Sequence, residues 1–275
     1  MSATEIFGIR AAVSGVACAS KWRAKTESAD NAIYCSASQN GPVRVAGNKD
    51  WQVGWRAYGS TPAVNPGVLF TFSGATKDGG GWKSEENGAI VEQVTIDWPV
   101  EGGKFVEHEL SAAAASGALT ANAAWAADSS IPNPVSAEGM GATFDGTAIT
   151  NLAHMRLILL AKNGFIPADS SSNGRAVRTP GNIDALAIVR TNIPGFSSIP
   201  AADTFGELVL GSKTGVTAWT ISYMQFMGST EVVEIETEDG RPKVVASDLH
   251  FAWTAYYNSE TGSITGPSGT LWPSA

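Results

Sequence analysis

Gly47-Asn48-Lys49-Asp50-Trp51-Gln52-Val53-Gly54-Trp55 is the stretch that decides the fold, because a similar stretch begins 134 residues later. There, Gly181-Asn182-Ile183-Asp184 precedes the apolar run Ala185-Leu186-Ala187-Ile188-Val189. In both places a Gly-Asn-x-Asp motif leads into a segment with the character of a β-strand. Self-similarity at one fixed spacing is the sequence sign of a repeated structural unit. The spacing is almost half of the 275 residues, so the repeated unit has the size of a domain.

Shorter matches extend the repeat on both sides of the motif. The matching pairs of segments are 9–24 with 149–164, 59–74 with 195–211, 94–98 with 219–223, and 116–120 with 261–265. The spacing falls to 125 at Thr95 and Thr220 and rises to 145 at Gly117 and Gly262, which predicts a deletion and then an insertion in the second copy. The alternative is a pair of unrelated β domains that share turn residues.

The repeat predicts a first domain at residues 1–128, a linker at 129–146 and a second domain at 147–275. Within the linker, Ile131-Pro132-Asn133-Pro134-Val135 cannot continue a helix. The second domain is expected to carry an inserted acidic hairpin near residues 227–246, turning at Asp239-Gly240.

Alternation of apolar and polar residues predicts antiparallel strands. Residues 93–98 and 249–257 alternate with period two and are rich in aromatic and β-branched side chains. The pattern predicts a mainly β fold of two tandem sandwich or barrel domains, each with at most a short helix. Those helices are expected within residues 26–34 and 120–127. The tryptophans of the alternating segments, Trp51, Trp55, Trp98 and Trp253, are expected in the core rather than stacked on a sugar.

Composition restricts the class of protein. Hydrophobic residues make up 43% of the chain, enough for real cores, and 30 glycines with 13 prolines indicate many turns. Charged residues make up 16%, against about 25% in an average domain, which favours a surface covered by neighbouring molecules. The net charge of −8 argues against tight nucleic-acid binding, which needs Lys and Arg on phosphates.

Compartment signals are few. No basic leader and no apolar run of about 20 residues occur, so we expect a soluble chain without a secretion signal or a membrane partner. Cys18 and Cys35 are either two thiols or a single pair.

Catalytic motifs are absent from the sequence. His108, His154 and His250 lack metal-ligand spacing, and neither a nucleophile elbow nor a phosphate-binding loop occurs. We therefore expect no catalytic residue, metal or cofactor. Glu107 and Glu109 fall on one face of a strand, where paired carboxylates could serve glycoside hydrolysis. A solvated or pore-facing strand is the favoured interpretation.

A family resemblance rests on residues 47–74. The Gly-Asn-x-Asp-Trp strand is followed by a Tyr58-Gly59 turn, a Pro66-Gly67 corner and Phe70-Thr71-Phe72-Ser73-Gly74. This order resembles the tail tube proteins, or major tail proteins, of long, non-contractile-tailed bacteriophages. Residues 93–98 and 105–110 resemble the last two strands of that family. The match covers about residues 40–120 directly, and 175–265 through the repeat, where Ile193-Pro194-Gly195 replaces the Tyr-Gly turn.

The resemblance implies a structural virion protein rather than an enzyme. Its domains would close side by side into a ring whose inner sheets form one barrel, and the rings would stack into the tube that conducts DNA during ejection. A duplicated variant would need three chains for a ring with pseudo-sixfold symmetry. The implied partners are further copies of the chain, the tape measure, terminator and distal tail proteins, and DNA in transit. The implied location is the virion tail, assembled in the bacterial cytoplasm.

Acidic residues receive two roles under this resemblance. Glu107, Glu109, Glu234 and Glu236 are expected to line a lumen that repels phosphates. The hairpin residues Glu231, Glu238, Asp239 and Arg241 are expected to contact an adjacent ring. The alternatives are a neck or distal-tail adaptor ring, a capsid decoration protein, a carbohydrate-binding module and a glycosidase.

Overall fold

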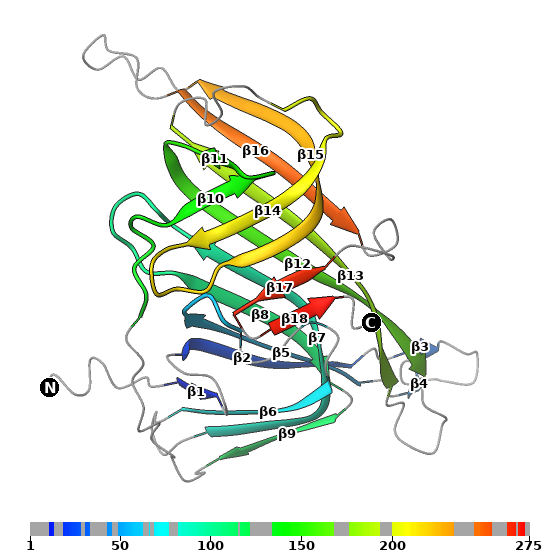
Figure 1. Ribbon diagram of the computed structural model, residues 1–275. Coiled ribbons are helices and arrows are strands. Elements are labelled where there is room, and N and C mark those ends of the chain that lie inside the picture. The colour runs from blue at the N-terminus through cyan, green and yellow to red at the C-terminus, as the bar shows by residue number, and fades with distance from the viewer. Residues whose placement is uncertain are drawn as a thin grey trace, which may run out of the picture.

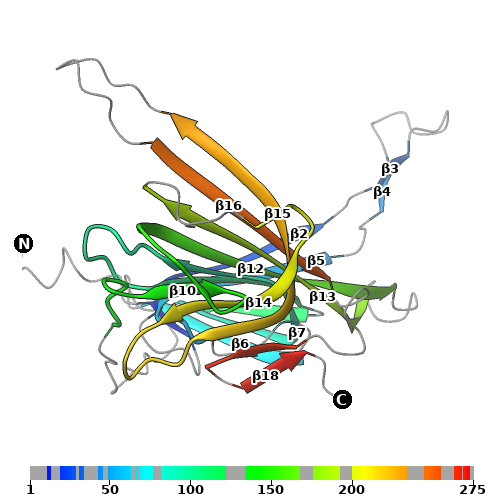
Figure 2. The same cartoon turned by 45° about the horizontal axis from the view of Figure 1, so that its top comes forward.

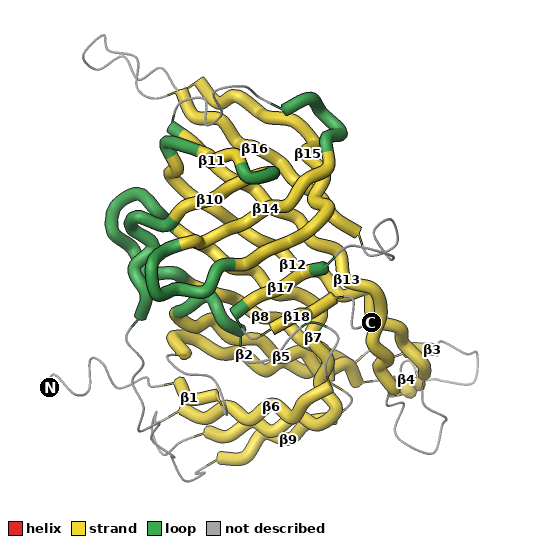
Figure 3. The backbone as a smooth tube through the Cα atoms, viewed as in Figure 1, coloured by secondary structure: helices red, strands yellow, loops and turns green. Residues whose placement is uncertain are grey.

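The computed structural model describes residues 11–13, 19–28, 31–33, 43–45, 49–62, 66, 69–76, 82–114, 116–121, 134–167, 176–192, 200–233, 245–254, 263–267 and 269–272. All regular structure in these residues is β-strand (Figure 3), which confirms the prediction of a mainly β fold. Sixteen of the strands belong to one antiparallel sheet, and β3 and β4 form a separate hairpin.

The strands are β1 Ala11–Val13, β2 Ala19–Ser28, β3 Asn31–Ile33, β4 Val43–Val45, β5 Lys49–Tyr58, β6 Leu69–Thr76, β7 Trp82–Trp98, β8 Glu107–Ala114, β9 Ser116–Ala121, β10 Gly141–Phe144, β11 Thr147–Ile149, β12 Leu152–Pro167, β13 Ala176–Thr191, β14 Phe205–Ser212, β15 Trp219–Val233, β16 Val245–Thr254, β17 Ile264–Gly266 and β18 Gly269–Trp272. We refer to β1–β9 as the first half and β10–β18 as the second half.

The sheet folds over on itself into two layers. Eight strands form the main layer, in the order β2-β5-β8-β7-β12-β13-β16-β15. Other strands of this sheet lie over it; in Figure 1, β10 and β14 cross in front of β12, β13 and β16. The long strands β7 and β15 take part in both layers. In β7, residues 90–97 pair with β8, residues 82–90 pair with β6, and residues 82–87 pair with β9. A bulge in such a strand allows it to bend from one layer into the other.

One pattern of strand pairing occurs twice. The first half pairs in the order β1-β6-β7-β8-β5-β2, and the second in the order β10-β14-β15-β16-β13-β12. In addition, β9 pairs with β7 as β17 pairs with β15. The bulges also correspond, since the register shifts between Val91 and Gln93 in β7 and between Phe226 and Gly228 in β15. The described residues therefore contain a repeat at the level of topology and register.

The register corrects the sequence match of the Thr95 strand. Thr95 pairs with Glu109, and its counterpart Thr230 pairs with Asp248. The match between the two halves of the sequence aligned Thr95 with Thr220, because Thr-Ile occurs at both places. Such a short pattern does not determine which strands are neighbours. Thr230 follows Thr95 by 135 residues and Asp248 follows Glu109 by 139, so the acidic hairpin is the counterpart of β7–β8 with four more residues.

Two further expectations differ from the structure. Residues 26–28 and 31–33 of the first expected helix are in β2 and β3, and residues 120–121 of the second are in β9; residues 34 and 122–127 lie outside the described part. Strand partners override a modest helix propensity there. Residues 141–144, expected within the linker, form β10 and pair with β14.

The core lies between the layers and is shared by both halves. Trp55, Trp98 and Trp253 are buried, as expected, whereas the side chain of Trp51 lies outside the described part. In the second half, the ring centroid of Phe144 is 6.3 Å from that of Phe226 and 5.1 Å from that of Phe251. These buried rings come from both layers and hold them together by apolar burial.

The Gly-Asn-x-Asp motif of the second half has a local structural role. Gly181 lies beside the register shift between Lys162 and Gly164, and a Cβ atom there would be 1.7 Å from the Lys162 carbonyl oxygen. Glycine permits this close approach of two backbones. The last residue of the motif, Asp184, forms an ion pair with Lys162 across the same two strands. Gly47 and Asn48 of the first motif lie outside the described part.

Tryptophans interlock the halves. Trp98 of β7 is fully buried beside Gly211 of β14. In the reverse direction, the Trp219 indole nitrogen of β15 donates a hydrogen bond to the Ser60 carbonyl oxygen at 2.9 Å. Each half thus contributes a large ring to a contact with the other.

The Gly211→Ala substitution should destabilise the chain by about 2–5 kcal/mol. Gly211 has a φ of +75°, and an added Cβ would lie 2.7 Å from the Trp98 indole nitrogen. Gly146 is the matched control, because it has a φ of +73° but nothing within 4 Å of an added Cβ. Gly146→Ala should cost about 1–2 kcal/mol. Urea unfolding measures both, and equal losses would contradict the packing argument.

Candidate assembly surface

The main layer has one face toward the core and one face away from it, which we call the polar face. Along β5, for example, Val53, Trp55 and Ala57 are buried while Arg56 and Tyr58 are exposed. Among the residues whose side chains the structure describes, the charged side chains of the polar face are Arg56, Asp97, Glu107, Glu109, Arg156, Lys162, Asp184, Arg190 and Asp248. Cations and carboxylates therefore nearly balance on this face, and Ile158, Leu186 and Ile188 lie among them.

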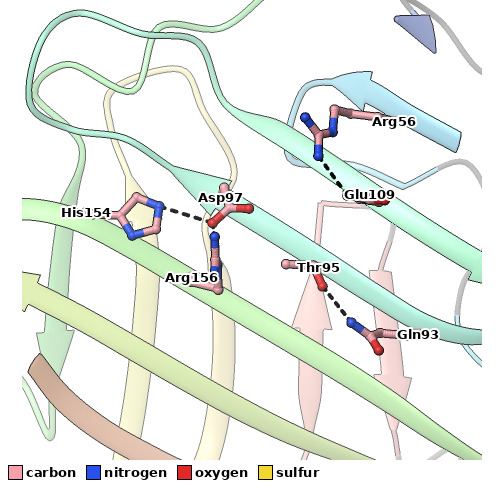
Figure 4. Close-up of polar contacts among 7 residues, drawn as sticks. All are labelled: Arg56, Gln93, Thr95, Asp97, Glu109, His154 and Arg156. Atoms are coloured by element: carbon pink, nitrogen blue, oxygen red, sulfur yellow. Dashed lines mark hydrogen bonds and ion pairs between the residues drawn. The ribbon is translucent and has the colours of Figure 1, made fainter. Parts of the chain in front are cut away.

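An ion pair occurs at the same place in both halves. Arg56 of β5 lies directly opposite Glu109 of β8, with Nη2 and Oε2 3.0 Å apart (Figure 4). Arg190 of β13 lies directly opposite Asp248 of β16, with Nε and Oδ1 2.7 Å apart. The hydrogen bond from Arg190 lowers the pKa of Asp248. The repeat thus extends to a pair of side chains with the same chemistry.

A third cluster lies on the junction between the halves, where β7 pairs with β12. Asp97 Oδ1 of β7 accepts from Arg156 Nε at 2.7 Å and lies 3.1 Å from His154 Nε2 of β12 (Figure 4). Burial acts to raise the pKa of Asp97, but the hydrogen bonds from His154 and Arg156 outweigh it and hold that pKa below its ordinary value. On the same strand, Gln93 donates to Thr95 at 3.0 Å.

The expected lumen and hairpin residues have different positions. Glu107 and Glu109 lie on the polar face, with Glu107 half-buried and Glu109 exposed and paired with Arg56. Glu231 is exposed and lies opposite Ser247, on the other face of the layer. Glu234, Glu236, Glu238, Asp239 and Arg241 lie outside the described part. Because Arg56 pairs with Glu109, the polar face is less acidic than the two glutamates alone indicate.

The histidines do not converge. His108 points into the core, where its Nδ1 donates to the Gly59 carbonyl oxygen at 2.8 Å. Burial lowers the pKa of His108 and outweighs the opposing effect of that hydrogen bond. His250 lies on the polar face, where its Nε2 is 3.2 Å from Thr230 Oγ1. Although β8 and β16 are corresponding strands, His108 and His250 therefore lie on opposite faces. Among the described residues, no group of His, Cys, Asp or Glu is placed to hold a metal.

The main layer ends in two open edges. At one end, the ladder of β2 is with β5 alone among the described residues. At the other end, residues 228–233 of β15 pair with β16 on one side, while β14 and β17 reach only residues 219–225. Figure 2 shows this part of the β15–β16 hairpin extending away from the body of the molecule. An open strand edge presents unpaired backbone donors and acceptors to a further strand.

Sequence reasoning did not single out the arginines of this surface. Arg56, Arg156 and Arg190 each lie opposite a carboxylate between 53 and 59 residues away in the chain. Alternation places each arginine on a polar face, but its partner depends on strand order and register. A signal was present in the Arg56 and Arg190 pair, since both lie nine residues after the first glycine of the motif.

No family model and no curated protein matches the chain. The described residues contain no helix that could span a membrane.

His108 should make the stability of the fold depend on pH. Below about 6.5 the unfolded chain takes up a proton that the folded chain resists, so the free energy of unfolding should fall by up to about 1.4 kcal/mol per pH unit. Above that pH this histidine is neutral in both states and contributes no slope. His108→Gln should remove this part of the slope in urea unfolding between about pH 5 and 7, whereas His250→Gln should retain it. An unchanged slope in His108→Gln would refute the assignment.

Asp97 should matter more for stability than Glu109. Asp97→Ala leaves Arg156 and His154 without their shared acceptor, which should cost about 1–3 kcal/mol. Glu109→Ala breaks a pair whose side chains are 50% and 61% exposed, so it should cost less than about 1 kcal/mol. Both residues are carboxylates on the polar face, which makes them a matched comparison in urea unfolding. A larger loss in Glu109→Ala would reverse this order.

Proposed function

We propose that this chain is a structural virion protein whose rings stack into the tail tube of a long, non-contractile-tailed bacteriophage. The proposal starts from the sequence resemblance at residues 47–74, and the observation that carries it furthest is the main layer with two different open edges. Copies that join through those edges form a continuous sheet. The proposal treats the repeated pairing pattern as two tandem domains.

The two edges differ, and this difference decides the kind of assembly. One edge is formed by β2 and the other by residues 228–233 of β15. A contact between unlike surfaces is heterologous, and it gives either a closed ring or an open filament. Closure of the ring leaves no open edge in the main layer, which removes the tendency to aggregate. A tube then requires such rings to stack.

The size of a three-chain ring is compatible with a conduit. Each chain contributes eight main-layer strands, so three chains would close a barrel of roughly 24 strands. With strands about 4.8 Å apart and tilted by about 40°, the backbone diameter would be roughly 48 Å. Barrels of about 16–18 strands already hold a water-filled channel. The chain would thus surround an open lumen.

The polar face would line this lumen. The arginines whose side chains are described on this face are held by carboxylates: Arg56 by Glu109, Arg156 by Asp97 and Arg190 by Asp248. Cations engaged in this way are less available to phosphates, so DNA would pass without sticking. Glu107 and Glu109, with Glu234 and Glu236, are the proposed acidic part of the lining. The hairpin residues Glu238, Asp239 and Arg241 are the proposed contact with the next ring.

Electron microscopy of the purified chain tests the proposal. Negative staining at high protein concentration should show tubes with a central hole, built of rings with threefold or pseudo-sixfold symmetry. Single rings that never stack would instead favour the neck or distal-tail adaptor. Monomers that bind glycans would favour the carbohydrate-binding module. Monomers without glycan affinity or rings would refute an assembly function.

A further inference from the structure

A row of paired residues crosses the first half of the main layer and continues into the second. Arg56 lies opposite Glu109, Glu109 lies opposite Thr95, and Thr95 lies opposite Ile158 of β12. The step from Thr95 to Ile158 is the junction between the halves. The Cα positions of this junction run from Met155 opposite Trp98 to Leu160 opposite Gln93.

The equivalent row of the second half stops one strand earlier. Arg190 lies opposite Asp248, and Asp248 lies opposite Thr230. On the side of Thr230 that faces away from β16, no described strand of the chain pairs with β15. The edge that β12 fills on β7 is therefore open at the corresponding residues of β15, Gly228 to Val233.

The counterpart of β12 in the first half is β2. Strand β2 forms the other open edge of the main layer. Ile158 of β12 lies opposite Leu186, four residues before Arg190. Lys25 of β2 lies opposite Gln52, four residues before Arg56. Lys25 thus has the register position in β2 that Ile158 has in β12. Each chain therefore has two open edges. One is on β15, the counterpart of β7, and the other is on β2, the counterpart of β12.

We propose that the open edge of β15 in one copy pairs with β2 of the next copy, in the register that the junction already uses. The pairing is antiparallel and places Thr230 opposite Lys25. It extends from Trp22 opposite Val233 to Glu27 opposite Gly228. The inference rests on the proposed function, because it specifies the contact that closes the ring.

Charge supports this pairing. The sequence of β2 includes Lys21, Arg23 and Lys25, whereas the open part of β15 includes the exposed Glu231. In the proposed register Glu231 lies opposite Ala24, so it falls on the face away from the register positions of Arg23 and Lys25 and forms no pair with them. The opposite charges of the two edges act on encounter, because they attract the two strands before they pair.

Polarity distinguishes this contact from the junction within the chain. Ser229 and Glu231 are exposed, while the residues at the same positions in β7, Val94 and Ile96, are fully buried. A polar open edge keeps a free copy soluble, since apolar edges aggregate. The contact between copies is therefore suited to form after folding.

Engineered cysteines test the register. In a Cys18→Ser, Cys35→Ser background, Lys25→Cys with Thr230→Cys should form disulfides between copies after mild oxidation, because directly opposed residues are within bridging distance. Non-reducing electrophoresis should show most of the chain shifted from monomer to covalent oligomers, with a closed trimer as the largest species. Each single cysteine variant should remain monomeric on the gel.

Matched pairs control for geometry. Thr95→Cys with Ile158→Cys sits at the same position of the junction and should form a disulfide within one chain. Lys25→Cys with Ser229→Cys is one residue out of register, and Lys25→Cys with Val232→Cys is two residues out, so neither should cross-link.

Microscopy of the same samples separates the two proposals. Rings together with cross-linking of Lys25→Cys to Thr230→Cys support both. Rings that form while only an out-of-register cysteine pair cross-links overturn the proposed register, and so do rings that form while no pair cross-links between copies. Neither result contradicts the tube function. Cross-linked rings that never stack support the edge contact and contradict the tube. Monomers that neither cross-link nor form rings overturn both.

Discussion

The antiparallel ladder between β7 and β12 is the contact on which the rest of the molecule depends. It joins two halves that each pair their strands in the same order, and it makes their main layers one sheet. Without it, each half would expose a further strand edge, with backbone groups that water or another chain must satisfy. Trp98 ends this ladder and is buried against the second half, so backbone pairing and apolar packing reinforce each other.

The ladder also gives the polar face its continuity. Because strands pair without interruption from β2 to β15, side chains of both halves lie in common rows on one surface. Arg56 with Glu109 and Arg190 with Asp248 lie in equivalent places, and Asp97 with Arg156 connects the halves between them. An exposed pair such as Arg56 with Glu109 contributes little to stability by itself. The effect of these pairs is to set the electrostatic character of an extended surface.

Much of the fold could be predicted from the sequence, because its signals are local. Period-two alternation identified strands such as those of Gln93 to Trp98, and the repeated motif located β5 and β13. Burial of Trp55 and Trp253 follows from the same alternation. Short helices were wrongly expected in residues now seen in β2 and β9, since propensity is weak beside the hydrogen bonds of neighbouring strands.

The candidate site could not be predicted to the same extent, because it depends on which strands are neighbours. Glu109 was recognised as a polar-face residue, but its partner Arg56 is 53 residues away and becomes adjacent only through strand order. The sequence match gave Thr220 as the counterpart of Thr95, whereas the strand register shows that the counterpart is Thr230.

The junction inside the chain also has a kinetic consequence. Its two strands are tethered by one polypeptide, so they meet at an effective concentration set by the connecting segment and not by the amount of protein. In an assembly that used the open edges, every second strand contact between domains would thus form at a rate independent of dilution. Joining three linked chains then takes two bimolecular steps before the ring closes on itself, whereas six unlinked domains would need five.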